Sequence, residues 1–230
     1  MPDQSELLCL SHPQGHAVPH QASKLAAVRD WWLRTLLVLQ RPRPVFVALR
    51  DDTREAAGDR SEQVLLIVLL AGIATLLFTG TAAHLNDDGS YSPILIAIWA
   101  FFAGSIYGLF AYFALGAVLH AGVKALGSQG SYRRSRHVLA FAAVPIALSL
   151  VTWPVKLALY GGDWFRAGGR DTGAGGVVFD LIELAFFVWA AVLLVIGVRA
   201  VHGWTWARAA AACALSLVAP VVLALLVSSL

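Results

Sequence analysis

The sequence predicts an all-α polytopic membrane protein with five transmembrane helices and a cytoplasmic N-terminal helical region. Of its 230 residues, 58% are hydrophobic and only 13% are charged. Soluble domains carry about 25% charged residues, so this chain has too few charges to cover a surface that faces water. The apolar residues gather in five long segments, and the basic residues lie almost entirely on one side of them.

Residues 1–21 are polar and are interrupted by three prolines, which predicts a disordered tail. His12, His16 and His20 are spaced by four, and on a helix this spacing could hold a metal ion. Because Pro13 and Pro19 would interrupt that helix, we predict no metal site there. No other cofactor is predicted. Two cysteines, far apart in the chain, predict no structural disulfide.

Residues 22–62 are predicted to form a cytoplasmic or interfacial helical region. Trp31 and Trp32 lie beside Arg29 and Arg34, a pattern typical of an amphipathic helix at the lipid headgroups. The alternative is a helix packed against the rest of the cytoplasmic layer. The prolines of residues 41–44 end this helix.

A second short helix should follow, with Pro44 in its first turn and Gly58 at its end. Its apolar residues Phe46 and Leu49 are expected to face the membrane or its loops. Charges of both signs between residues 50 and 60 indicate a solvated, ion-paired face rather than an acidic metal site.

Residues 63–230 form the predicted transmembrane domain. Its five apolar segments cover residues 63–85, 93–123, 137–160, 177–202 and 206–230, and each is compatible with the ~20 residues that a spanning helix needs. If the N-terminus is inside, fourteen basic residues lie on the inner side and only Arg166 and Arg170 on the outer side, with Lys156 in the membrane. The positive-inside rule therefore predicts a multi-pass protein of the cell (plasma) membrane, N-terminus cytoplasmic and C-terminus external.

The chain resembles the Yip-domain (Ypt/Rab-interacting protein) integral membrane proteins. The resemblance rests on PVFVALR at residues 44–50 and SYRRSRHVLAFAAVPIAL at residues 131–148, within residues 41–230. It implies a non-enzymatic membrane protein, which in eukaryotes is linked to vesicle traffic. Abundant Arg, Ala, Gly and Val indicate the bacterial branch. The residues that carry the family-like motif are Pro44, Phe46, Tyr132, Arg134, Phe141 and Pro145.

The second apolar segment carries small residues four apart, at Ala100, Gly104, Gly108 and Gly116. This spacing lets two helix backbones approach closely. The partner helix could belong to the same chain or to a second copy in a homodimer.

The strongest polar signal is a predicted intramembrane charge cluster. Lys156 lies near the end of the third segment, and Asp180 and Glu183 lie in the first turns of the fourth. Since these segments run in opposite directions, all three residues should lie at the same depth near the outer boundary, where His84 could join them. The cluster could be a structural ion pair, an unpaired set that reaches the outer surface, a proton or ion site, or a catalytic carboxylate pair.

The loop of residues 161–176 is rich in glycine but lacks the order of a phosphate-binding loop. We expect a flexible external loop, with Trp164 and Phe165 resting at the membrane interface.

Together these patterns favour a non-catalytic membrane scaffold, trafficking or organising factor, or accessory subunit, acting through its N-terminal region. The alternative is a small transporter or lipid-handling protein that uses Lys156, Asp180 and Glu183. No matched set of catalytic residues supports an enzyme. The expected partners are the lipid bilayer and either a second copy or another membrane protein, with no nucleic acid.

Overall fold

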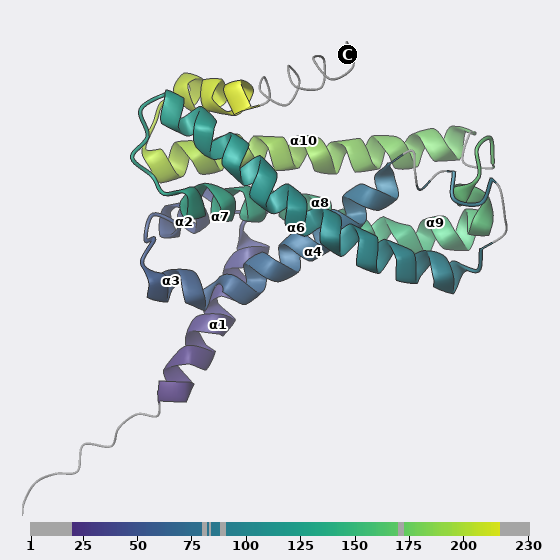
Figure 1. Cartoon of the computed structure of the whole chain (residues 1–230), viewed down its shortest axis with the longest axis horizontal. Coiled ribbons are helices and arrows are strands. Elements are labelled where there is room, and N and C mark those ends of the chain that lie inside the picture. Colours follow the sequence, from purple (N-terminus) through teal and green to yellow (C-terminus); the bar gives the residue numbers. More distant parts are fainter. Residues whose placement is uncertain (1–19, 80–81, 83, 88–90, 170–172, 217–230) are drawn as a thin grey trace, which may run out of the picture.

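A computed structural model describes residues 20–79, 82, 84–87, 91–169 and 173–216, and these contain helices and turns but no strand (Figure 1). Almost all of the predicted tail lies outside the described residues, although its last two residues already belong to the first helix. Three helices form the N-terminal region: α1 (His20–Leu37), α2 (Pro42–Ala48) and α3 (Arg54–Asp59). The bundle that follows contains α4 (Ser61–Phe78), α6 (Pro93–Ala125), α7 (Tyr132–Ala142), α8 (Val144–Leu148), η2 (Ser149–Val151), α9 (Thr152–Tyr160), η3 (Gly161–Phe165) and α10 (Ala174–His202).

Four helical segments of the described chain are long and apolar enough to cross a membrane. They cover Ser61–Phe78, Ile94–Ala125, Tyr132–Phe165 and Ala174–His202. The fifth predicted span begins as a helix over residues 206–216, and its remainder lies outside the described residues. The five-span topology therefore stays a prediction.

The third span is an interrupted helix rather than one continuous α-helix. Its first helix, α7, ends at Ala142, and Pro145 lies in the first turn of α8. Proline has no N–H to donate, so the hydrogen-bond ladder cannot continue through it unbroken. A 3-10 turn, η2, then connects α8 to α9. The third span therefore consists of consecutive short helices.

Glycines bring α4 and α6 into close contact. A Cβ atom on Gly104 would lie 2.5 Å from the Cα of Ile73, and one on Gly72 or Gly108 would meet the opposite backbone. The partner helix is therefore α4 of the same chain. The alternative, a homodimer contact through Gly104 and Gly108, is wrong because α4 already covers this face. Gly116 serves a different purpose, since the side chain of Arg136 lies directly over it.

Phe46 is buried inside the protein and does not face the membrane. Neither Phe46 nor Leu49 has any exposed surface, and the Phe46 ring occupies the space left by Gly197 of α10. The predicted single helix of this region is in fact two, because Thr53 caps a new helix, α3, and Asp51 accepts a hydrogen bond from the Thr53 N–H. Pro42 occupies the first position of α2, and Pro44 lies in its first turn, as predicted. The N-terminal helices are thus packed onto the bundle.

The two tryptophans of α1 have different surroundings. Trp31 is 7% exposed and packs against Phe141, with ring centroids 5.5 Å apart. Trp31 is therefore part of the core, which leaves Trp32, 38% exposed, as the candidate interfacial residue. Its neighbour Arg34 pairs with Asp30 at 2.5 Å, and Arg29 is exposed.

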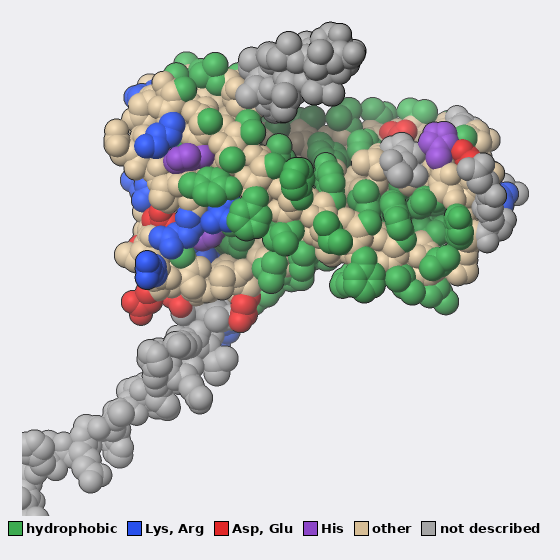
Figure 2. All heavy atoms as spheres, viewed as in Figure 1, with side chains coloured by type: hydrophobic (Ala, Val, Ile, Leu, Met, Phe, Trp, Pro, Cys, Tyr) green, Lys and Arg blue, Asp and Glu red, His purple; other side chains and the backbone are tan. Residues whose placement is uncertain are grey.

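The surface divides into an apolar middle and two polar ends (Figure 2). Arginines gather at the end formed by α2, α3 and α7, and a smaller polar group lies at the opposite end. Large apolar side chains between these ends are exposed, among them Ile106 and Phe110 of α6, both at least 70% exposed. Such a band is what lipid chains cover in a membrane protein.

Candidate functional site

The candidate site is a buried ion pair between α9 and α10. The Lys156 ammonium donates a hydrogen bond to Oε1 of Glu183, and the two side chains are only 1% and 3% exposed. Thr152, at the start of α9, also approaches the same carboxylate oxygen, at 3.5 Å. The antiparallel course of α9 and α10 brings the two residues to one depth, as the direction of the chain requires.

Three aromatic rings enclose the ammonium. Its nitrogen lies 4.2 Å from the ring centre of Trp164, 4.8 Å from that of Trp153 and 5.6 Å from that of Phe179. Ring faces attract a cation, and the attraction is stronger where water is excluded. The aromatic rings therefore stabilise the charged form of Lys156 independently of Glu183.

Spacing along the helices places these rings. Trp153 lies three residues before Lys156 on α9, and Phe179 lies four before Glu183 on α10, so each ring shares a face with its charge. Trp164 arrives from η3, after Gly161 ends α9 with a φ of +58°, a conformation that favours glycine.

Two other residues of the predicted cluster, Asp180 one turn before Glu183 on α10 and His84, are not part of this ion pair. Asp180 is exposed, and within the described chain it makes no ion pair. His84 is 61% exposed and bonds Asp87 at 2.6 Å, so the expectation that His84 joins the cluster is wrong. Asp87 also accepts a hydrogen bond from the backbone of Ala167, and these two bonds lower the pKa of its carboxyl. This contact ties the loop after α4 to the loop after η3.

Trp164 and Phe165 are core residues, contrary to the expectation that they rest at the membrane interface. They are 7% and 2% exposed, and Phe165 stacks on Trp153 with ring centres 5.7 Å apart. The backbone carbonyl of Phe165 accepts a hydrogen bond from Asn86. The described start of the loop is therefore a packed lid over the ion pair rather than a free segment.

A second polar centre lies at the basic end of the molecule. Asp52 accepts a hydrogen bond from Arg133 at 2.9 Å and another from the Ser131 hydroxyl. Burial raises the pKa of the Asp52 carboxyl, but these hydrogen bonds outweigh burial and lower it. Asp52 thereby joins the N-terminal region to the start of α7.

Arg60 is fully buried beneath α1. Its Nε donates to His137 at 2.9 Å, its Nη2 lies 3.9 Å from Asp52, and its guanidinium faces the ring of Trp31. Burial lowers the pKa of Arg60 while Asp52 raises it. The interpretation of residues 50–60 as a solvated face is therefore wrong for Arg60, because α1 covers it.

Three further contacts join the predicted inner loops. Arg50 donates to the carbonyl of Ala200 at the end of α10, and Arg134 donates to the carbonyl of Arg50 at 2.8 Å. The Ser128 hydroxyl oxygen and Nδ1 of His202 lie 3.2 Å apart, within hydrogen-bonding distance. These bonds hold the N-terminal region, the loop before α7 and the end of α10 at the same end of the molecule.

The family-like residues lie around this end. Phe141 and Pro145 are core residues, and the Tyr132 hydroxyl donates to the carbonyl of Phe113 at 2.7 Å. Pro44 is exposed. Residues 36–229 match the family model described as the Yip1 domain.

The chain belongs to the Yip1 domain family. The matched residues include all of the bundle and α2 and α3 of the N-terminal region. Comparisons with curated proteins and with solved structures gave no significant match. Family membership and the four apolar helices make this Yip1 domain protein a multi-pass membrane protein. The match does not separate the branches of the family, so the bacterial assignment stays a prediction.

Proposed function

We propose that this Yip1 domain protein is a non-catalytic membrane scaffold or accessory subunit that binds a partner through its N-terminal region. The enclosure of the Lys156–Glu183 pair supports this proposal most directly. A carrier needs a water-filled path to its charged site. Here the two charges are paired and covered by aromatic rings. An ion pair of this kind joins two helices and fixes their relative position.

The N-terminal region is the candidate binding surface. Among its exposed residues are Arg43 of α2 and Arg54 of α3, and neither makes an ion pair within the described chain. Both helices are held against the bundle by Phe46, Arg50 and Asp52. A partner would therefore meet a rigid surface rather than a flexible tail.

The proposed topology has five spans, with the N-terminus in the cytoplasm and the C-terminus outside the plasma membrane. The basic loops support this arrangement because they gather at one end of the molecule, where positive charge is typical of the cytoplasmic side. Within it, residues 22–62 are a cytoplasmic region and residues 63–230 the membrane domain. A reporter enzyme fused after Leu230 tests the topology. If the topology is right, a reporter that works only outside the cytoplasm is active, and one that works only in the cytoplasm is not.

The function is tested by purification in mild detergent, followed by identification of the proteins that copurify. Three proteins are compared: the unaltered chain, Arg43→Glu with Arg54→Glu, and Lys156→Met with Glu183→Gln. The first double variant should lose copurifying proteins, and the second should retain them. If only the second variant loses the copurifying proteins, a function at the ion pair is favoured. If both variants retain them, the N-terminal binding surface is contradicted.

A further inference from the structure

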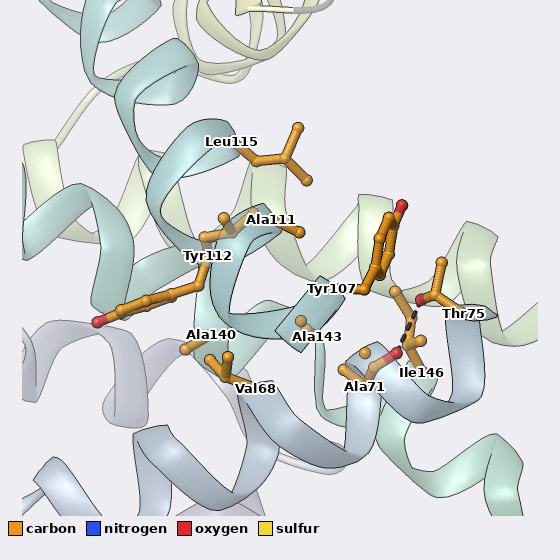
Figure 3. Close-up of a pocket in the computed structure, with 13 residues that line it drawn as sticks. Val68, Ala71, Thr75, Tyr107, Ala111, Tyr112, Leu115, Ala140, Ala143 and Ile146 are labelled. Carbon is orange, nitrogen blue, oxygen red and sulfur yellow. Dashed lines mark hydrogen bonds between the residues drawn. The ribbon is translucent and has the colours of Figure 1, made fainter. Parts of the chain in front are cut away.

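A groove on the membrane face lies between α4, α6, α7 and α8, with a volume of about 120 Å³ (Figure 3). Its floor consists of small residues, among them Ala71, Gly108 and Ala143. Tyr112 lies at one end of the groove, and Tyr107 and Thr75 lie at the other. The groove is lined almost entirely by apolar atoms, which suits a hydrocarbon chain better than a polar ligand.

Beside this groove lies an arginine, Arg136, that pairs with no carboxylate among the described residues. The Arg136 guanidinium lies 4.6 Å from the ring centres of Phe113 and Tyr132 and 5.2 Å from that of Tyr112. Its stem lies over Gly116, where a Cβ atom would collide with it. Tyr112 is shared, because it both lines the groove and contacts the guanidinium.

The hydrogen-bonding capacity of Arg136 is unused within the described chain. Its Nε is buried without a partner, and none of the described acidic residues pairs with it. The arginines around it differ, since Arg133 bonds Asp52 and Arg134 bonds the carbonyl of Arg50. A guanidinium held in place by stacked rings and lacking a counter-ion is suited to a phosphate, which it can bind through two parallel hydrogen bonds.

We propose that the groove and Arg136 together bind an anionic phospholipid, with an acyl chain in the groove and the phosphate on the guanidinium. Acyl chains surround this face of a membrane protein, and the anionic charge complements the unpaired arginine. Basic residues near the membrane surface attract anionic lipids in this way. Residues 217–230 contain no acidic side chain, so that segment cannot supply a carboxylate side chain to Arg136.

The proposal is tested by native mass spectrometry of the full chain, released from nanodiscs that contain phosphatidylglycerol and phosphatidylcholine in equal amounts. The unaltered protein should retain phosphatidylglycerol preferentially. Arg136→Gln should reduce that preference about five- to tenfold, the effect of losing one favourable charge contact. Arg136→Lys should reduce it less, because lysine keeps the charge but not the planar pair of donors. Arg166→Gln removes an exposed arginine that follows η3, outside the helices that line the groove, and should leave the preference unchanged.

The acyl-chain half of the proposal needs its own variants. Ala111→Phe fills the groove and should lower retention of both lipids, whereas Ala117→Phe, on an exposed part of α6 outside the groove, should leave retention unchanged. An unchanged preference in both Arg136 variants would overturn the phosphate contact. Equal retention in Ala111→Phe and Ala117→Phe would overturn the groove. Circular dichroism shows whether each variant is folded. If Arg136→Gln does not fold, the comparison of Arg136→Lys with the unaltered protein tests the phosphate contact.

Discussion

Removing Lys156 should destabilise the protein more than removing its partner, Glu183. In Lys156→Met, the Glu183 carboxylate stays buried with only Thr152 near it, since its Oε2 already has no partner in the structure. Leaving one charge of a buried pair alone costs about 3–5 kcal/mol. In Glu183→Gln, the ammonium keeps its three aromatic rings, and such contacts contribute about 0.5–2 kcal/mol where water is excluded.

The double variant provides the decisive comparison. Replacing both members of a buried ion pair by uncharged residues often changes the free energy of unfolding little. The double variant Lys156→Met with Glu183→Gln should therefore be more stable than Lys156→Met alone. Unfolding of the detergent-solubilised protein, followed by tryptophan fluorescence, gives the four free energies of a double-mutant cycle. Asp180→Asn is the matched control, because Asp180 is exposed and should change stability little. Additive single effects, or a larger loss in Glu183→Gln than in Lys156→Met, would refute this reasoning.

Three other results are expected. Gly104→Ile with Gly108→Ile should destabilise the protein by more than the 1–3 kcal/mol typical of overpacking, because backbone atoms of α4 occupy the space. Asp52→Asn should flatten the acid dependence of stability: the folded-state pKa of Asp52 is lowered, so its contribution is present above about pH 4 and is lost as pH falls through that pKa. In vesicles of brominated lipid, Trp31→Phe should keep the quenching signal of α1 and Trp32→Phe should lose it, because only Trp32 is exposed.

Each of these results has a control. Gly58→Ala, at a glycine with nothing within 4 Å, should be tolerated. Glu55→Gln removes an exposed carboxylate of α3, so an equal flattening in Asp52→Asn and Glu55→Gln would contradict the special role of Asp52. Quenching of Trp31 equal to that of Trp32 would mean that α1 does not pack on Phe141.

The sequence was sufficient to place the ion pair but not its surroundings. Chain direction alone brings Lys156 to the depth of Glu183, because consecutive spans run in opposite directions. Helical spacing could also have indicated Trp153 and Phe179, which share a face with these charges. Trp164 could not be found this way, since its position depends on the path of η3 after Gly161.

Long-range packing explains most of the other differences. Adjacent residues of a helix point about 100° apart, so Trp31 and Trp32 face different directions, and only the tertiary structure decides which of them is buried. Phe46 seemed suited to the membrane because it is apolar, but it fits the gap at Gly197, far away in the sequence. The mixed charges of residues 50–60 gave no sign that α1 covers Arg60.

Solvent access to the ion pair is the most direct test of the proposed scaffold. Thr152→Cys places a thiol beside Glu183, and Ser92→Cys places one in an exposed position at the same end of the molecule. Both are made in a background in which Cys9 and Cys213 are replaced, and a membrane-impermeant thiol reagent is applied to proteoliposomes. A scaffold with an enclosed ion pair requires labelling at residue 92 and none at residue 152. Equal labelling at both positions would reveal a water-filled path to the charges and would contradict the scaffold in favour of a transporter.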